Sequence, residues 1–204
     1  DGIYRNFAPL RHKEILAQIA GGVRVFGAAS YGALRAAELH DHGMVPLGRV
    51  ARAYCDGTIR DDGEVAVLHA PYEGHSRLTV PLVSIRFALD DWQEQGRIGG
   101  AEAEAMFRRL AGVNFASRTL SVVRDALERY AMIREVDAFL AAIAHGVDVK
   151  ARDAEAAVRY LGALDPNEGI DAPKHRWQTA AARMAEFEAR KVHPEFPLTH
   201  RQLT

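Results

Sequence analysis

The stretch from Gly22 to Leu39 constrains the fold of this chain more than any other. It opens with an apolar run, continues through a turn rich in small residues between Gly27 and Gly32, and then takes the apolar spacing of a helix. A short buried strand, a tight turn and a helix are therefore predicted, with Ser30 at the turn. A serine there can direct its hydroxyl at a ligand from a helix end that carries unpaired N–H groups. Such a turn suits either an activated nucleophile beside an oxyanion hole or a phosphate cradle.

The pattern along the chain predicts an α/β protein whose two halves differ. Up to about residue 98, short apolar runs alternate with Gly- and Asp-containing turns, which predicts an N-terminal α/β half with a short, mainly parallel sheet. Beyond it the spacing predicts a mostly α-helical C-terminal half. We expect an α/β core at residues 1–98 and a helical region at 99–204 packed on it, as two units or as one continuous domain. The predicted strands are 22–26, 64–69 and 82–86, and the predicted helices are 10–20, 30–42, 47–55, 101–110, 117–129, 133–144, 154–161 and 177–190.

The composition narrows the classes of function. A chain of 204 residues can bury a hydrophobic core, and its formal charge of −1 gives no overall attraction to nucleic acid or to an anionic membrane. The single cysteine, Cys55, excludes an internal disulfide framework and a Cys-rich metal site, and its surroundings predict a small buried residue. No apolar run approaches the roughly 18 residues of a membrane span. We expect a cytoplasmic protein with no nucleic-acid or membrane partner and with no metal or other cofactor.

A nucleophilic serine requires a base, and the chain offers three candidates. Lys13 lies in the predicted helix 10–20, which ends just before the strand that leads to Ser30. An exposed lysine is protonated at neutral pH, so Lys13 needs burial or the positive field of a helix end to lower its pKa, and its apolar neighbours favour partial burial. His12 and His69 are alternative bases. The alternatives without chemistry are an N-cap serine, a solvated lysine and hydrogen-bonded structural histidines.

Other groups could bind the substrate rather than attack it. The backbone N–H groups of Tyr31 and Gly32 are candidate oxyanion donors because they open the helix. Arg35 and Arg86 could each bind an anionic substrate group, or serve only as ion-pair partners. An acidic run is interpreted as a turn rather than as a metal loop, since its spacing fits no EF-hand; it comprises Asp61, Asp62 and Glu64.

Five sequence blocks, taken together, resemble the TfuA-like family. They are H-K-E-I-L at residues 12–16, G-A-A-S-Y-G-A-L-R-A-A-E-L at 27–39, G-M-V-P-L-G at 43–48, D-D-G-E-V-A-V-L-H-A-P at 61–71 and P-L-V-S-I-R at 81–86. The resemblance covers roughly residues 1–90. Members of this family usually carry more chain before the D-G that opens this sequence.

The resemblance implies an accessory protein of peptide-backbone thioamidation. Its partners would be a YcaO-type enzyme, the peptide substrate of that enzyme and a ThiS-like sulfur-carrier protein that ends in a thiocarboxylate. Carried over to this chain, the catalytic pair of the family is Ser30 and Lys13. This pair would hydrolyse the thiocarboxylated carrier and release sulfide to the YcaO-type enzyme.

Two other functions stay open. One is a non-catalytic scaffold that binds the YcaO-type enzyme and its peptide through the helical half, where Trp177, Phe187 and Phe196 have basic neighbours. The other is a nucleotide- or phosphate-binding protein that uses the Ser30 turn. It is the weakest of the three, because the chain has no P-loop G-K-[ST].

Overall fold

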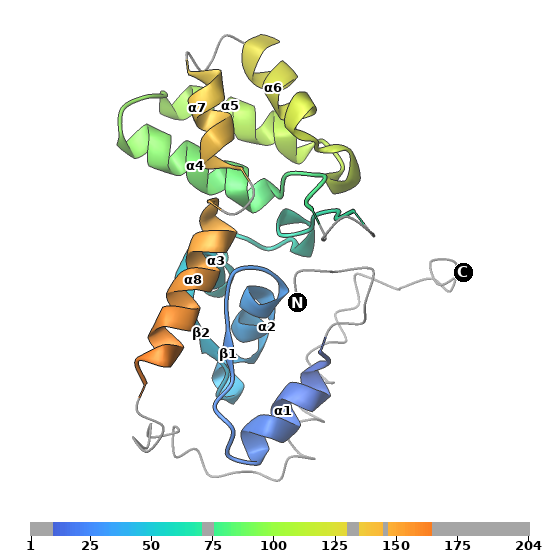
Figure 1. Cartoon of the computed structure of the whole chain (residues 1–204), viewed down its shortest axis with the longest axis vertical. Coiled ribbons are helices and arrows are strands. Elements are labelled where there is room, and N and C mark those ends of the chain that lie inside the picture. Colours follow the sequence, from blue (N-terminus) through green and yellow to red (C-terminus); the bar gives the residue numbers. More distant parts are fainter. Residues whose placement is uncertain (1–9, 71–75, 130–134, 145–146, 165–204) are drawn as a thin grey trace, which may run out of the picture.

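A computed structural model describes residues 10–70, 76–129, 135–144 and 147–164 of the chain. The elements in chain order, with η for a 3₁₀ helix, are α1 (His12–Ala20), β1 (Phe26–Gly27), α2 (Tyr31–Leu39), η1 (His40–His42), β2 (Val45–Pro46), α3 (Gly48–Cys55), η2 (Asp62–Glu64), α4 (Leu82–Glu94), α5 (Gly100–Ala111), η3 (Phe115–Ser117), α6 (Leu120–Arg129), α7 (Val136–Ala142) and α8 (Val149–Gly162). Figure 1 shows α1, α2, α3 and the strands in the lower part of the molecule and α4 to α7 in the upper part. α8 begins below α4 and runs down beside the lower part.

The two strands form a short parallel sheet, which confirms the predicted α/β arrangement of the N-terminal half. Phe26 of β1 pairs with Val45 of β2, and Gly27 pairs with Pro46. The pairing begins one residue earlier, where the Val45 N–H donates to the Val25 carbonyl at 2.9 Å. The first predicted strand, 22–26, therefore overlaps the observed β1 only at Phe26, and β1 continues to Gly27. β2 is not among the predicted strands, because two residues are too few to show an alternating pattern.

Two predicted strands are wrong, and both errors come from continuous apolar runs. Residues 82–86 form the first turn of α4, where Leu82, Val83, Ser84 and Ile85 are all buried. Periodicity cannot distinguish a helix buried on all sides from a buried strand. Residues 64–69 form the end of η2 and an irregular segment, in which His69 makes an isolated bridge.

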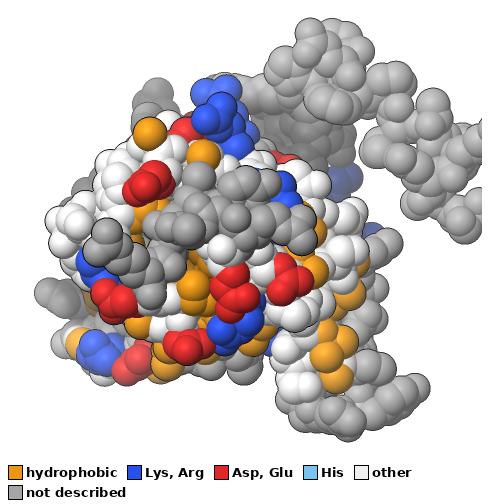
Figure 2. Space-filling view, turned by 90° about the horizontal axis from the view of Figure 1, so that it is seen from above, with side chains coloured by type: hydrophobic (Ala, Val, Ile, Leu, Met, Phe, Trp, Pro, Cys, Tyr) orange, Lys and Arg blue, Asp and Glu red, His pale blue; other side chains and the backbone are white. Residues whose placement is uncertain are grey.

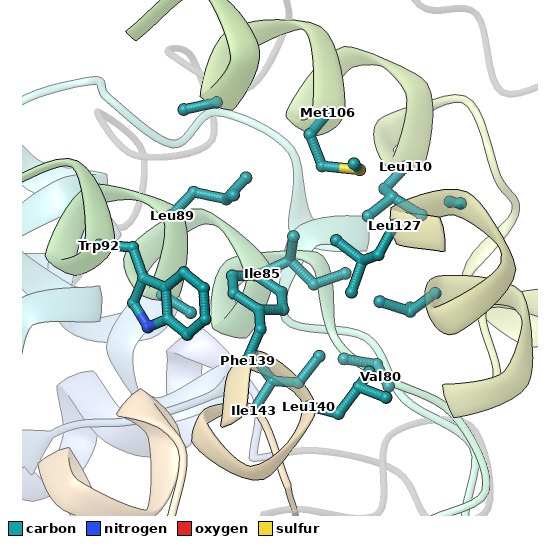
Figure 3. Close-up of a cluster of buried hydrophobic side chains, with 14 of the residues drawn as sticks. Val80, Ile85, Leu89, Trp92, Met106, Leu110, Leu127, Phe139, Leu140 and Ile143 are labelled. Atoms are coloured by element: carbon teal, nitrogen blue, oxygen red, sulfur yellow. The ribbon is translucent and has the colours of Figure 1, made fainter. Parts of the chain in front are cut away.

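The helical half is built on one apolar cluster, shown in Figure 3. Trp92 of α4 meets Phe139 of α7 edge-on, with ring centroids 5.1 Å apart and ring planes at 90°. Edge-to-face pairs of this kind contribute about 0.5–1.5 kcal/mol beyond their buried area. Around them pack apolar side chains of α4, α5, α6 and α7, among them Ile85, Leu89, Met106, Leu110, Leu127, Leu140 and Ile143. The predicted helical C-terminal half is thus confirmed over its described residues.

α4 also packs against the lower part of the molecule, so it belongs to two cores. Its Val83 and Phe87 join a second cluster with Val50 of α3, Ala33 of α2 and Val149 of α8. A third cluster connects α1, α2 and the residue before β2; its members are Ile15, Ile19, Ala36, Leu39 and Met44. The predicted domain boundary at residue 98 comes just after α4, the helix that both parts share. The division into two domains stays a prediction.

α8 is fastened to α3 by a buried carboxylate. Asp153 is 5% exposed, and its two oxygens accept from the Arg49 N–H at 2.9 Å and the Val50 N–H at 2.8 Å. These N–H groups open α3 and have no acceptor within their own helix. Gly48 lies so close that a Cβ there would be 2.3 Å from the Asp153 carboxyl carbon. A residue distant in sequence therefore caps α3.

α8 is longer than predicted because it has its own cap. The Asp148 side chain accepts from the Ala151 N–H at 3.1 Å, so the helix begins at Val149 rather than at residue 154. The predicted helix 177–190 and the three late aromatic residues lie outside the described residues, as does the start of the helix predicted at 133–144.

The described surface is mixed in character. Figure 2 shows acidic, basic and apolar side chains interspersed on the end of the molecule that the helical half forms. No described helix combines the length and the apolar character needed to cross a bilayer. Cys55 is exposed, so its predicted burial is wrong. It falls with Arg52 on the solvent face of α3, whereas Val50 and Tyr54 are buried.

Candidate functional site

The turn between β1 and α2 is closed by tight backbone packing. A Cβ on Gly27 would lie 2.0 Å from the Gly32 carbonyl oxygen and 2.8 Å from the Ala36 Cβ. α2 can begin directly against the end of β1 because residue 27 has no side chain. Ala29 has a φ of 67°, in the left-handed region that costs a residue with a Cβ about 1–2 kcal/mol. The predicted strand–turn–helix is present, with strain stored at the residue before Ser30.

Ser30 occupies the N-cap position of α2 but does not cap it with its side chain. Its carbonyl accepts from the Ala33 N–H at 3.0 Å and the Leu34 N–H at 3.3 Å, which starts the helix. A capping serine would place its hydroxyl on an N–H of the first turn, and this half-buried hydroxyl makes no such bond. The N–H groups of Tyr31 and Gly32 stand at the same helix end, ahead of the first residue that bonds back to Ser30. The Ser30 hydroxyl and these two N–H groups thus belong to the same end of α2.

The two neighbouring bases of α1 face different ways. Lys13 is exposed, so its predicted partial burial is wrong. Ile15 is the residue that turns inward, being 5% exposed, and a helix places residues two apart on different sides. His12 points at α2, where its Nε2 lies 2.6 Å from Oε2 of Glu38. The pairing of Lys13 with Ser30 stays a prediction, and His12 contacts Glu38 and Arg35 on α2, the helix that follows the serine.

Four polar side chains, His12, Tyr31, Arg35 and Glu38, form what we call the Arg35 cluster. Residues 31, 35 and 38 share one face of α2 by helical spacing. Arg35 Nη2 donates to the Tyr31 hydroxyl at 3.0 Å, and the guanidinium carbon lies 4.4 Å from the Tyr31 ring centroid. Arg35 Nη1 donates to Glu38 Oε2 in a short ion pair and lies 3.1 Å from His12 Nε2. Arg35 Nε is buried and has no hydrogen-bond partner among the described residues.

Glu38 is the site residue that the sequence analysis missed. It contacts both Arg35 and His12, which were candidates, and so it organises them. Its position three residues after Arg35 on a predicted helix was a sufficient signal, because side chains at this spacing meet on one face.

Arg86 and His69, two further candidate site residues, make contacts outside the Arg35 cluster. Arg86 Nε and Nη2 donate to the two carboxylate oxygens of Glu64 at 2.9 and 2.7 Å, and its guanidinium carbon lies 4.0 Å from the Phe107 ring centroid. Glu64 is 7% exposed, so this is a largely desolvated bidentate pair of the kind that orders a core. His69 is half-buried and bridges to Arg77 across an antiparallel pair. For Arg86 the structure shows the ion-pair alternative.

The acidic run forms a turn, as interpreted from the sequence. Asp61 Oδ1 accepts from the Gly63 N–H at 2.8 Å and caps η2. Glu64, the last residue of η2, is committed to Arg86. Within the ranges that the structure describes, no group of three or more His, Cys, Asp or Glu side chains is placed to hold a metal ion.

A second polar network is buried where α8 begins. Asp148 accepts from Arg77 Nη1 and from the Ser84 hydroxyl, both at 2.6 Å. Burial lowers the pKa of Lys150 to about 8, and its amine donates to the Val65 carbonyl at 2.9 Å. Ser84 is only 2% exposed and already bonded, so it cannot meet a substrate. This network fastens α8 to α4 and to the segment before it.

A hollow of about 400 Å³ lies between α4, α7 and the start of α8. Small side chains such as Ala88 leave the space, and charged ones surround it, including Asp91, Arg97 and Arg152. The Arg97 guanidinium carbon lies 3.7 Å from the Trp92 ring centroid. None of the predicted site residues lines this hollow.

Comparison with known proteins gives one family. A family model described as TfuA-like protein matches residues 1–119, more than half of the 204 residues. The match includes the turn between β1 and α2, the whole Arg35 cluster and all of α4 and α5. No curated protein matches the chain.

Proposed function

Because this chain belongs to the TfuA-like family, we propose that it hydrolyses a thiocarboxylated sulfur carrier in support of peptide-backbone thioamidation. The family is associated with YcaO-dependent systems and supports an accessory role in thioamidation. The proposed partners are a YcaO-type enzyme, its peptide substrate and a ThiS-like sulfur carrier. The chain would be a thiocarboxylate hydrolase whose nucleophile is Ser30.

In the proposed reaction, Ser30 Oγ attacks the carbonyl carbon of the terminal thiocarboxylate. A base takes the hydroxyl proton as the O–C bond forms, and the C–S bond then breaks to expel sulfide, which takes up that proton. Water cleaves the acyl-serine and returns the carrier as a carboxylate. The sum is RCOS⁻ + H₂O → RCOO⁻ + H₂S. The N–H groups of Tyr31 and Gly32 would stabilise the oxyanion that forms in both steps.

The observation that carries this proposal is that the Ser30 side chain makes no capping hydrogen bond at the N-terminus of α2. The residue before the serine is strained, and the hydroxyl is not used to cap the helix. A helix N-terminus attracts anions, and a thiocarboxylate is an anion. Arg35 lies one turn further along the same helix, where Glu38 pairs with it.

Lys13 is the base in the family's pair and keeps that role in the proposal. It is exposed in the free protein. Docking of the carrier would have to remove water from around the amine, because desolvation favours the neutral form that a base requires. His12 is the alternative base.

The decisive experiment is Ser30→Ala, with sulfide release from a thiocarboxylated carrier as the readout. We expect a loss of at least about 10³-fold, in line with the removal of other nucleophiles. The matched control is Ser117→Ala, which removes an exposed hydroxyl from η3 and should leave turnover unchanged. Undiminished sulfide release by Ser30→Ala would refute the nucleophile.

The hollow beside Trp92 favours a second candidate, a non-catalytic scaffold for the YcaO-type enzyme and its peptide. A scaffold needs no nucleophile, so under this candidate Ser30→Ala would support thioamidation as well as the unaltered protein when free sulfide is supplied. Under the hydrolase proposal, supplied sulfide should likewise rescue Ser30→Ala, whereas carrier-dependent thioamidation should fail. The carrier-dependent reaction therefore distinguishes the two.

A further inference from the structure

The charge of Arg35 is already neutralised in this structure. Glu38 forms a short ion pair with Arg35 Nη1, and the side chains of Arg35 and Glu38 are only 12% and 33% exposed. An incoming anion would have to compete with Glu38 for the guanidinium. A cation that another carboxylate holds at close range attracts a further anion weakly, because the two fields largely cancel.

His12 determines how firmly Glu38 holds Arg35. The same oxygen, Glu38 Oε2, meets both Arg35 Nη1 and His12 Nε2. An ionised carboxylate only accepts hydrogen bonds, so at 2.6 Å the hydrogen lies on His12 Nε2. The ring then gains or loses charge at Nδ1. With a neutral ring the Arg35 cluster carries no net charge, and with a protonated ring it carries one positive charge.

We propose that the Arg35 cluster is a proton-coupled binding site for the terminal carboxylate or thiocarboxylate of the carrier. His12 takes up one proton as the anion binds, and the imidazolium pairs with Glu38. Arg35 is then released to bind the anion beside Ser30. This inference rests on the proposed function for the identity of the ligand. Glu38 is the positioning residue, since it holds both partners and does not itself meet the anion.

Two further features fit an anion-binding arginine. Arg35 Nε is buried and without a hydrogen-bond partner in the described part of the chain, so the guanidinium keeps one donor unused. The Tyr31 ring lies against the guanidinium at 4.4 Å, and its hydroxyl binds Nη2 at 3.0 Å, which fixes the plane of the fork. Tyr31 directly follows Ser30 in the chain, so the arginine is oriented by the residue next to the nucleophile.

Charged groups surround His12 on more than one element. From α2, Arg35 and Glu38 lie against its ring. On and beside its own helix they are Arg11, Lys13 and Glu14, all exposed and therefore screened by solvent. Glu14 is also engaged, since its carboxylate accepts from the Arg11 N–H at 2.8 Å. Glu38 is accordingly a carboxylate in direct contact with the ring.

The test measures binding rather than turnover. The Ser30→Ala protein is titrated by calorimetry with a short synthetic peptide that ends in a carboxylate, with its thioacid and with its amide. We expect both acids to bind and the amide to bind at least about tenfold more weakly. The affinity for the acids should fall as rising pH removes the proton from the ring, with a limiting slope of about tenfold per pH unit, as one linked proton requires. Buffers of different ionisation enthalpy should report the uptake of one proton per peptide.

Added to the Ser30→Ala background, His12→Gln should bind the acids with no proton uptake and with an affinity that does not change over the same pH range. Glu38→Gln should also lose the proton uptake, and because it frees Arg35 it should bind the acids at least as tightly at pH 8. The matched control is His40→Gln, which alters an exposed histidine at the other end of α2. Each variant is first checked for an unchanged melting temperature.

Equal affinity for acid and amide, or the same pH dependence with and without His12, would overturn the inference. Because this readout needs no nucleophile, it separates the two proposals. Proton-coupled binding of the acids combined with no sulfide release from the unaltered protein would refute the hydrolase and leave the anion site standing. Sulfide release that depends on Ser30, combined with binding of the acids that takes up no proton, would refute the proton-coupled anion site and leave the hydrolase proposal standing.

Discussion

Single backbone positions shape the site at the scale of residues. Gly27 lets the start of α2 touch the end of β1, and Ala29 accepts a left-handed conformation just before the serine. The Ser30 turn could be predicted because a strand, a cluster of small residues and a helix follow one another locally. The spacing of Arg35 and Glu38 predicts their own contact, but the exposure of Lys13 and the contact of His12 with Glu38 could not be reached the same way, since both depend on which side of α1 faces α2.

Gly27→Ala should destabilise the protein severely. The added methyl would lie 2.0 Å from the Gly32 carbonyl oxygen, and backbone cannot move aside cheaply. We expect the free energy of unfolding to fall by about 3 kcal/mol or more in urea denaturation. The control is Gly22→Ala, where φ is +85° but nothing lies within 4 Å, so only about 1–2 kcal/mol of backbone strain applies. Equal losses in both variants would contradict the packing argument.

Lys13→Arg should reduce sulfide release from the carrier by at least about 10²-fold. A guanidinium stays protonated and cannot accept the Ser30 proton, although it keeps the charge and much of the length of lysine. Steady-state kinetics should show the loss in kcat with the stability unchanged, because Lys13 is exposed. Full activity in Lys13→Arg, combined with a comparable loss in His12→Gln, would transfer the role of base to His12.

Lys150 should make stability depend on pH. Burial lowers its pKa to about 8 in the folded protein, against about 10.4 when unfolded. Between these values the unfolded chain binds more protons, so the stability of the folded state rises with pH. Relative to Lys150→Met, the wild type should therefore gain on the order of 1 kcal/mol between pH 8 and pH 10 in denaturant titrations. If the difference in unfolding free energy between the wild type and Lys150→Met stays constant or falls over this pH range, the lowered pKa of Lys150 is contradicted.

Short elements and buried helices limit what a pattern can predict at the scale of elements. The helices with one solvent face, such as α2, α5 and α6, were found from their spacing. α4 was mistaken for a strand over its first turn because it is buried from two sides, by the helical half and by α2 and α3. The start of α8 was placed too late because its capping residue, Asp148, is held in a tertiary hydrogen-bond network. Local sequence carries no record of such partners.

Asp153→Ala should loosen α3 although the residue lies in α8. It would leave the Arg49 and Val50 N–H groups buried without their acceptors. The expected loss is about 2 kcal/mol in the free energy of unfolding. Hydrogen exchange should quicken at the start of α3 in particular. Glu155→Ala, an exposed change on the same helix, is the control and should cost less than about 0.5 kcal/mol.

At the scale of the whole molecule, the proposed chemistry and the helical half occupy different parts of the chain. The turn and the Arg35 cluster lie on α1 and α2, whereas the hollow beside Trp92 lies between α4, α7 and α8. α4 and α8 connect these parts. α4 contributes side chains to two apolar cores, and the carboxylates of Asp153 in α8 and of Asp148 just before it bind α3 and α4. These two helices therefore give a route by which a change in one part can reach the other.

Removal of residues 165–204 should separate recognition from chemistry. These residues include Trp177, Phe187 and Phe196, and every contact of the described site lies before them. We expect binding to the YcaO-type enzyme to fall by about tenfold or more, while sulfide release from the free carrier persists. Co-purification and the sulfide assay measure the two. Retained binding by the folded, shortened chain would place the interface within residues 1–164.

The cap that Asp153 gives to α3 also sets an order of events during synthesis. The bonds join residues 104 and 103 positions apart, so the first turn of α3 has no acceptor for its N–H groups until the ribosome has made α8. The α/β half cannot finish folding as it emerges, although it is made first. Throughout translation of α4 to α7 the first turn of α3 would lack the cap that Asp153 provides. The packing of α3 against its neighbours is therefore completed only near the end of translation of the described chain.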